Sequence, residues 1–250
     1  VSERMLDLAG VGPGTRLYDV GSGRGDPAIR AAMRAAPDGS VLGIELHESV
    51  LAIARERALS AGVTNVRLRA GSAEEADWVE PAAFDAATAR WSLMYMNAPD
   101  AALAHARRAL RSGGVLVVAS WVEPARVEWA TFTRNVLARY RDLPPVEPHK
   151  PGPFRHAESV VLGCELERAG FAVEHEEELD VVVFEGTSAD SIVAWCFDFG
   201  FARLAEELSD DAYGAFETAL LREAERRAED GRYRLRGVTR LTVARALHSS

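Results

Sequence analysis

The 250-residue sequence predicts a doubly wound α/β domain, in which helices cover both faces of a mostly parallel sheet. Three observations support this prediction. Short apolar runs of strand length alternate with amphipathic helical stretches through residue 121. The apolar runs show little polar alternation, which is typical of parallel strands buried on both faces. A glycine-rich turn joins the first of these runs to the helix that follows it.

The elements follow in a regular order. After a short lead-in helix over 2–9, five strands are expected at 17–20, 40–45, 66–70, 84–92 and 115–121. The helices between them are expected at 26–36, 47–61 and 97–110, and Asp26 and Pro27 fit the N-cap and first turn of the first one. Later segments predict helices at 124–140 and 158–169, a sixth strand at 171–184, two helices within 188–231 and a final antiparallel edge strand at 233–246.

Composition limits the class of protein. With 48% hydrophobic and 27% charged residues, residues 1–250 suit one globular domain. A net charge of -9 argues against a broad nucleic-acid footprint, and no apolar run approaches the roughly 18 residues of a membrane span. Cys164 and Cys196 lie in separate apolar contexts without a Cys/His cluster, so we expect two reduced core cysteines, no metal site and a cytoplasmic protein.

The glycine turn predicts a cofactor site. A backbone that passes under a ligand needs residues without a Cβ, and the helix that follows offers free N–H groups. The spacing is GxGxG, whereas a dinucleotide turn would have its third glycine at Asp26, where a carboxylate is a poor neighbour for a pyrophosphate. Asp19, near the end of the first strand, could meet a cationic amine. The expected cofactor therefore has an ammonium and no phosphate, and its turn residues are Gly21, Ser22, Gly23 and Gly25.

At this point the sequence resembles the class I S-adenosylmethionine-dependent methyltransferases, nearest to the ubiquinone/menaquinone biosynthesis and natural-product branch. The resemblance covers about the first half of the chain, in the family's order. It implies a Rossmann-like, seven-stranded sheet with its last strand antiparallel, S-adenosyl-L-methionine as cofactor and S-adenosyl-L-homocysteine as product. The residues that carry it are LYDVGSGRGDPA at 17–28, VLGIE at 41–45, AGSAEE at 70–75, FDAATARWSLMYM at 84–96 and ALRSGGVLVVASW at 109–121.

Further cofactor contacts are expected at the ends of the second and third strands. Glu45 lies 20 residues after Gly25, and in a doubly wound fold it comes beside the glycine turn, where its carboxylate could accept from both ribose hydroxyls. Leu46 would lie against the adenine. The resemblance implies an aspartate that accepts from the adenine amine, but this chain has Ser72 there, so the Ser72 hydroxyl or the Ala73 backbone would take that place.

The fourth and fifth strands supply the acceptor side. By the switch-point rule the crevice lies over the carboxyl ends of the first and fourth strands, so Arg90 should border the cofactor. Trp91 and Tyr95 would border the transferred methyl, and Trp121 is a second candidate for the crevice wall. The alternative for the two tryptophans is that they only fill the core.

The second half of the chain is expected to cover the acceptor. The cofactor-binding half is 1–121, and the lid segments are 124–155 and 187–230, because a long polar loop and surplus apolar helices commonly roof a site. His149 and His156 flank the exit of that loop, and either could deprotonate a substrate hydroxyl. The alternative is that both are solvated loop residues.

The predicted function is methyl transfer to an O, N or C atom of a small, aromatic or polyketide/quinone-like metabolite, by a monomer or homodimer with no nucleic-acid or membrane partner. A sulfonium methyl is already electrophilic, so alignment and exclusion of water are the main requirements. Three alternatives stay open: a cofactor-binding protein with a cyclising or structural role, an NAD-dependent oxidoreductase, which Asp26 disfavours, and a tRNA or protein methyltransferase, which the acidic charge disfavours.

Overall fold

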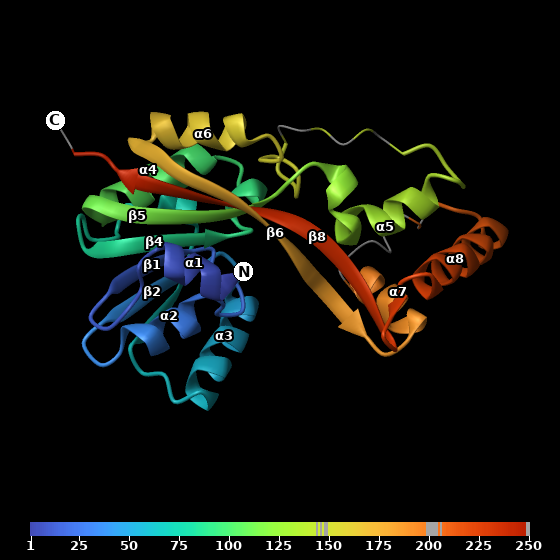
Figure 1. The fold of residues 1–250 in the computed structure, drawn as a ribbon, viewed down its shortest axis with the longest axis horizontal. Helices are drawn as coiled ribbons and strands as arrows, with labels where there is room; N and C mark the ends of the chain where they lie inside the picture. Colours follow the sequence, from blue (N-terminus) through green and yellow to red (C-terminus); the bar gives the residue numbers. More distant parts are fainter. Residues whose placement is uncertain (144, 146, 148–149, 199–204, 206, 249–250) are drawn as a thin grey trace. The chain divides into compact units, whose positions relative to one another are not determined.

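The computed structural model describes residues 1–250 except 144, 146, 148, 149, 199–204, 206, 249 and 250 (Figure 1). Its helices are α1 (Ser2–Leu8), α2 (Ala28–Ala35), α3 (Glu48–Ser60), α4 (Pro99–Ala109), α5 (Glu128–Leu137), α6 (Ser159–Arg168), α7 (Ala189–Asp198) and α8 (Asp210–Glu225), with 3-10 turns η1 (Ala73–Glu75), η2 (Leu93–Tyr95) and η3 (Pro124–Arg126). The strands are β1 (Arg16–Val20), β2 (Ser40–Glu45), β3 (Val66–Ala70), β4 (Phe84–Arg90), β5 (Leu110–Trp121), β6 (Phe171–Gly186), β7 (Ala228–Glu229) and β8 (Arg232–Ala246).

The chain divides into two compact units. The first comprises Val1–Ser120, Pro148–Leu179 and Arg240–Ser250, and the second comprises Trp121–Glu147 and Asp180–Thr239. The first unit therefore contains the glycine turn and strands β1 to β4, and the long strands β6 and β8 run from one unit into the other.

The sheet has the order β3-β2-β1-β4-β5-β8-β6, with β7 paired to β8. Strand β1 pairs in parallel with both β2 and β4, and β4 pairs in parallel with β5. Figure 1 shows β8 running opposite to its neighbours β5 and β6. The predicted doubly wound fold with an antiparallel last strand is confirmed, and with the two-residue β7 the sheet has eight strands among the described residues.

The predicted edge position of the final strand was wrong. Strand β8 lies between β5 and β6, and β6 forms that end of the strand order. The burial pattern gives the physical reason: four consecutive residues of β8, 241–244, are buried, as in a strand covered on both faces. By contrast, β6 is acidic and exposed over 173–176, which suits an edge.

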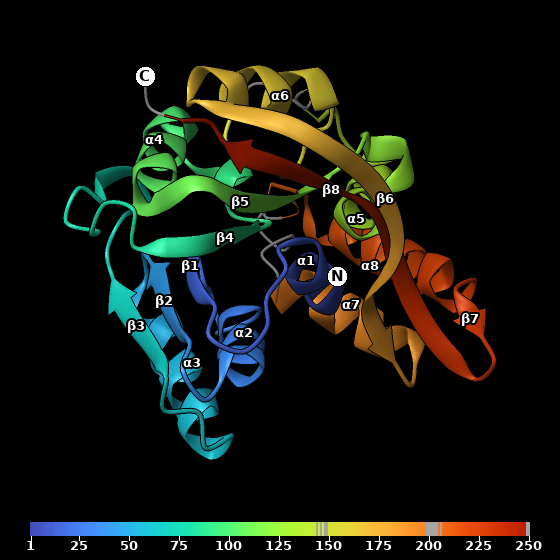
Figure 2. The same cartoon turned by 60° about the vertical axis from the view of Figure 1, so that its left-hand side comes forward.

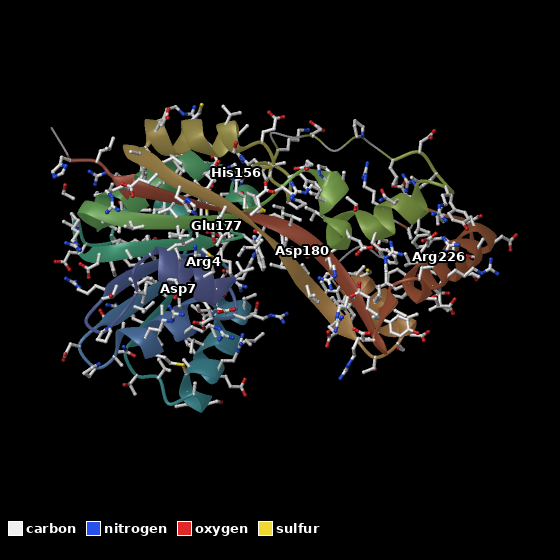
Figure 3. All side chains as sticks on the ribbon, viewed as in Figure 1. Arg4, Asp7, His156, Glu177, Asp180 and Arg226 are labelled. Atoms are coloured by element: carbon white, nitrogen blue, oxygen red, sulfur yellow. The ribbon has the colours of Figure 1, made fainter. Side chains whose placement is uncertain are left out.

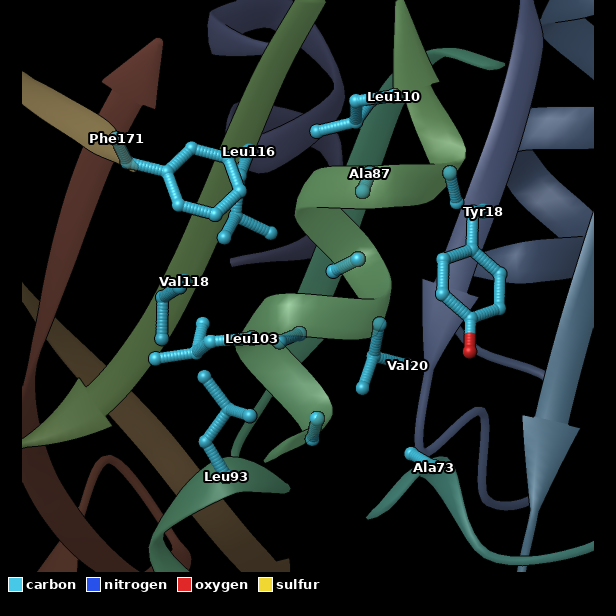
Figure 4. Packing of buried hydrophobic residues seen from close by; sticks show 14 of the residues in the cluster. Tyr18, Val20, Ala73, Ala87, Leu93, Leu103, Leu110, Leu116, Val118 and Phe171 are labelled. Carbon is cyan, nitrogen blue, oxygen red and sulfur yellow. The ribbon is translucent and has the colours of Figure 1, made fainter. Parts of the chain in front are cut away.

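Two apolar layers sandwich the sheet of the first unit. Because strand side chains alternate between faces, Leu17 packs with α1 and α2 whereas Tyr18 packs on the side of α4 and α6. Figure 2 shows α4 and α6 on the opposite side of the sheet from α1 and α2. Figure 4 shows the second layer, in which Leu103 of α4 lies over the strand residues Val20 and Val118.

The start of α2 differs from the prediction. The helix begins at Ala28 with Pro27 at the N-cap position, and no side chain caps it. The Asp26 carboxylate instead accepts a hydrogen bond from the Ser2 hydroxyl at 3.0 Å and from Arg30 Nε at 3.1 Å. These partners draw the carboxylate toward α1 and along α2, away from the first-turn amides.

Helix α1 is fixed to the first unit by ion pairs. Arg34 on α2 binds Glu3 and Asp7, and Arg4 binds Glu177 of β6 at 2.7 Å, a pair labelled in Figure 3. Surface ion pairs contribute little individually, but these pairs hold the lead-in helix against both α2 and β6.

Aromatic rings form the core of the second unit. Trp129 lies 5.3 Å from Trp121 and 6.3 Å from Trp195 between ring centroids, and Phe184 lies 5.3 Å from Trp195. A Cβ on Gly237 would approach the Trp121 and Trp129 rings to 3.0 Å, so only glycine fits there without a shift.

Cys196 is buried as predicted, but Cys164 is exposed, so its predicted place in the core was wrong. Residue 164 lies on the outer side of α6, whose buried face is formed by Leu162, Glu165 and Leu166. Among the described residues, no helix is long and apolar enough to cross a membrane.

Candidate functional site

The glycine turn follows β1 directly and needs its glycines. Gly21, Gly23 and Gly25 have φ values of +74°, +53° and +90°, a region that other residues rarely adopt. A Cβ on Gly21 would lie 2.4 Å from the Cβ of Ser92, the second residue after β4, whose hydroxyl donates to Val20 O at 2.6 Å. A Cβ on Gly23 would meet nothing within 4 Å, so this side of the turn borders open space.

Glu45 binds the glycine turn. Its Oε2 accepts from the Gly23 N–H at 3.0 Å, and its Oε1 accepts from the His47 N–H at 3.1 Å. The parallel register of β1 and β2, with Val20 opposite Ile44, brings the two strand ends together. The expected neighbourhood of Glu45 and the turn is therefore present, and Leu46 beside it is 61% exposed.

Asp19 lies beneath the turn and is fully buried. Its Oδ1 accepts from the Thr88 hydroxyl at 2.7 Å, across the β1–β4 pairing, whereas its Oδ2 has no hydrogen-bond partner. Burial raises the pKa of Asp19 from 3.8 to about 7, and the Thr88 hydroxyl, Arg90 and the Ala28 N–H oppose that shift. An orphaned carboxylate oxygen is costly, so this group favours a cationic partner.

The loop after β3 lies beside Glu45, because the Gly71 N–H donates to Glu45 O at 2.9 Å. Ser72 is the N-cap of η1, and its hydroxyl oxygen accepts from the Glu74 N–H at 3.1 Å. The hydroxyl hydrogen of Ser72 stays available as a donor, and Ala73 is buried.

Arg90 contacts the glycine-turn loop directly. Its Nε donates to Asp26 O at 3.0 Å, its Nη1 lies 3.5 Å from Asp26 Oδ2, and its guanidinium lies 4.9 Å from the Trp91 ring centroid. Trp91 has φ +52°, a strained conformation for an aromatic residue of the kind that clusters at functional sites. Arg90 thus connects the loop before α2 to the end of β4.

The other predicted acceptor residues lie in different settings. Tyr95 in η2 is 46% exposed, and desolvation raises its pKa to about 12, so the phenol stays protonated at neutral pH. Trp121 is 2% exposed in the aromatic core of the second unit. This placement of Trp121 is that of a packed core side chain.

His156 is fully buried, so it is not a solvated loop residue. Its Nε2 lies 2.8 Å from Oε2 of Glu165, which is 6% exposed, and its Nδ1 has no partner. Figure 3 labels His156. His149 lies outside the described residues.

The segment that carries His156 is docked on η2. The Gly152 N–H donates to Met94 O at 2.9 Å, and Arg155 donates to Met96 O at 2.7 Å and lies 3.9 Å from Glu165. Sequence reasoning missed Glu165, although a carboxylate on the apolar face of α6, beside Leu162 and Leu166, was a signal for a buried partner.

A hollow of about 530 Å³ lies between α2 and α3 and meets the turn only at Gly25 and Asp26. It lies outside the arrangement of Gly23, Glu45 and Asp19, and we do not place the cofactor in it.

The strand ends thus bring together an open glycine turn, a carboxylate hydrogen-bonded to it and a buried unpaired carboxylate oxygen, which fit an ammonium-bearing nucleoside. A family model described as "Methyltransferase domain" matches residues 12–143, more than half of the chain. The chain belongs to the S-adenosylmethionine-dependent methyltransferases. S-adenosylmethionine is accordingly its cofactor.

Two curated relatives show how far the similarity extends. Nocamycin O-methyltransferase of Saccharothrix syringae is 29% identical over 244 residues, covering 92% of this chain and 85% of that protein. Ubiquinone/menaquinone biosynthesis C-methyltransferase UbiE of Cupriavidus necator is 39% identical over 111 residues, but only 44% of each chain is covered. The second match is thus limited to less than half of each protein.

Solved structures share the fold. The [4+2]-cyclase SpnF aligns with a TM-score of 0.63 and 25% identity, covering 99% of this chain and 81% of that one. A SAM-dependent methyltransferase from Aquifex aeolicus aligns with a TM-score of 0.55 and 18% identity, covering 71% and 83%.

Replacing Glu45 by alanine should weaken S-adenosylhomocysteine binding by about 1–3 kcal/mol, the range for loss of a charged hydrogen-bond partner. Isothermal titration calorimetry measures the change. Glu48→Ala removes an exposed carboxylate three residues along and should leave the affinity unchanged. Equal affinities for Glu45→Ala and the unaltered chain would contradict the role of Glu45.

The raised pKa of Asp19 predicts a pH-dependent stability. Between about pH 4 and 7 the unfolded chain carries this carboxylate ionised while the folded chain keeps it protonated, so the free energy of unfolding falls as pH rises. The Asp19→Asn variant has no carboxyl at this position, so its free energy of unfolding does not fall in this way. The difference between the free energy of unfolding of the variant and that of the native chain should therefore rise with pH between about pH 4 and 7. Urea unfolding checks this, with exposed Asp38→Asn as control; a difference independent of pH would contradict it.

Proposed function

We propose that this methyltransferase transfers the methyl group of S-adenosylmethionine to an O, N or C atom of a small aromatic or polyketide/quinone-like metabolite. The observation that carries the proposal is the extent of the match to nocamycin O-methyltransferase, which covers 92% of the chain and so both of its units. A match confined to the cofactor half would support the cofactor alone.

In this proposal the strand ends bind the cofactor. Glu45 accepts from the ribose hydroxyls, Leu46 lies against the adenine, and Ser72 or the Ala73 backbone meets the adenine edge. Gly23 supplies the open backbone, and Asp19 receives the amine, whose positive charge favours the ionised form of this buried carboxyl. Arg90 positions the turn through Asp26, because its donors already point to that loop.

In this proposal the acceptor binds at the end of β4. Trp91 and Tyr95 border the transferred methyl there and help to exclude water. The Trp121 and Trp129 rings pack on each other in the core of the second unit, so they are not counted as a surface for the acceptor. Trp121 contributes by holding that unit's core.

The cofactor supplies an electrophilic methyl group when it is bound. The chain contributes alignment of the nucleophile, exclusion of water and, for a hydroxyl acceptor, a base. His156 is the base of this proposal: Glu165 accepts from Nε2–H and fixes the tautomer, which leaves Nδ1 to take the hydroxyl proton. His149 remains the second candidate base from the sequence.

Partners and compartment complete the proposal. The acidic net charge of -9 supports a protein without a nucleic-acid partner, and two free cysteines suit a reducing, cytoplasmic compartment. A monomer or homodimer suffices, because the cofactor residues all come from one chain.

Product mass tests the proposed reaction. Incubation with S-adenosylmethionine carrying a deuterated methyl group and a panel of phenolic, polyketide and quinone-like acceptors should yield one product with that labelled methyl. A product isomeric with its substrate, formed without loss of the label from the cofactor, would instead support the cyclising role that the likeness to the [4+2]-cyclase SpnF suggests.

Replacing His156 by glutamine should lower turnover of a hydroxyl acceptor by about 10²–10⁴-fold, the usual contribution of a general base. S-adenosylhomocysteine affinity should not change. His175, which is exposed and lies 3.1 Å from Glu177, gives a matched His–Glu control, and His175→Gln should keep full turnover. Full turnover in His156→Gln would show that the transfer proceeds by alignment alone.

A further inference from the structure

One crossover of the first unit lacks the helix that the others have. The connections after β1, β2 and β4 contain α2, α3 and α4, whereas residues 71–83, all of which the structure describes, contain only the three-residue η1. The segment from Ala76 to Ala83 therefore takes the place of a covering helix. The face of β2 and β3 that such a helix would cover is therefore only partly covered.

A hollow of about 450 Å³ lies over these strands. Arg16, Arg67 and Arg69 line it, and Trp78, Phe84 and Leu42 form its apolar part. Tyr18 of β1 is opposite Leu42 of β2, and Leu42 is opposite Arg67 of β3. Side chains at opposite positions of neighbouring strands point to the same face of the sheet, and Tyr18 packs on the α4 side. The hollow therefore lies on the α4 side. It is built entirely within the first unit.

The charge of the hollow is unusual for this protein. Several other arginines of the first unit bind carboxylates, as Arg111 binds Asp85 at 2.8 Å, whereas others, such as Arg107, bind backbone carbonyls. Among the described residues, Arg16, Arg67 and Arg69 have no carboxylate within ion-pair distance, and Glu80 is the one acidic residue of the lining. A chain of net charge -9 thus gathers three unneutralised guanidinium groups at one concave place.

Aromatic contacts orient two of these groups. The Arg69 guanidinium carbon lies 3.4 Å from the Trp78 ring centroid, and that of Arg16 lies 5.9 Å from the Phe84 centroid. A guanidinium packed on a ring keeps its N–H donors at its rim, where they can bind an anion. Arg67 and Arg69 are two residues apart on β3, so they point to the same face about 7 Å apart.

Charges on an edge strand also oppose the addition of another strand. Protection of an edge strand does not require that all the charges be positive. It also does not require that they pack on aromatic rings or line a hollow. The three features together are those of a site that receives an anion.

We propose that this hollow binds the phosphate group of a small organic phosphate, at a place separate from the cofactor turn. A phosphate has several oxygens on one centre and so matches guanidinium groups that line one hollow, each of which can donate two parallel hydrogen bonds. The apolar part of the hollow takes the organic part of the ligand. Extended nucleic acid is disfavoured, because the acidic surface outside the hollow repels its backbone.

Calorimetric titration with pyrophosphate and with glycerol phosphate tests the proposal, using the full chain saturated with S-adenosylhomocysteine so that the cofactor site is filled. One site per chain is expected. The double variant Arg67→Gln/Arg69→Gln should bind at least about tenfold more weakly, since each charge-assisted contact contributes appreciably. The control Arg222→Gln removes one exposed charge of α8 and should bind like the native chain.

Three results would overturn the proposal: no binding of either probe at millimolar concentration, equal weakening in Arg222→Gln, or tighter binding of a short single-stranded RNA than of both probes. Unchanged S-adenosylhomocysteine affinity in the double variant shows that the variant is folded.

Discussion

The hydrogen bond from the Gly23 N–H to the Glu45 carboxylate is the contact on which the cofactor site depends. It joins the turn after β1 to the end of β2 at 3.0 Å, and it exists because parallel pairing puts both strand ends at one edge of the sheet. The same parallel order brings Ser92, after β4, against Gly21. Three loops far apart in sequence thus meet at the glycine turn, where a Cβ on Gly23 would meet nothing within 4 Å.

Asp26 extends this arrangement to the acceptor side. A dinucleotide turn would have a glycine here, but this chain has a carboxylate that binds Ser2, Arg30 and Arg90. Through Arg90 it is connected to Trp91, whose left-handed backbone places a large ring at the end of β4. In the sequence, Asp26 disfavoured a pyrophosphate ligand. In the structure the same residue has a structural role, because it connects the turn to α1 and to β4.

The features that could be predicted from the sequence are those set by local residue patterns and by the length of a single crossover. The place of Glu45 beside the turn follows from one right-handed crossover, whose geometry is nearly invariant, and it was found where expected. The place of β8 depends on pairing between segments more than a hundred residues apart, which no local pattern encodes, and the edge prediction failed. The burial of His156 and Trp121 could not be predicted for a related reason: it is set by Glu165 and by Trp129, partners that only the fold brings near.

The central claim is that the open turn and Glu45 hold S-adenosylmethionine. A crystal structure of the chain with S-adenosylhomocysteine tests it most directly. We expect the ribose hydroxyls within hydrogen-bond distance of the Glu45 carboxylate and the ligand passing over Gly23. A nucleoside bound elsewhere, with Glu45 still bonded only to the Gly23 and His47 amides, would contradict the claim.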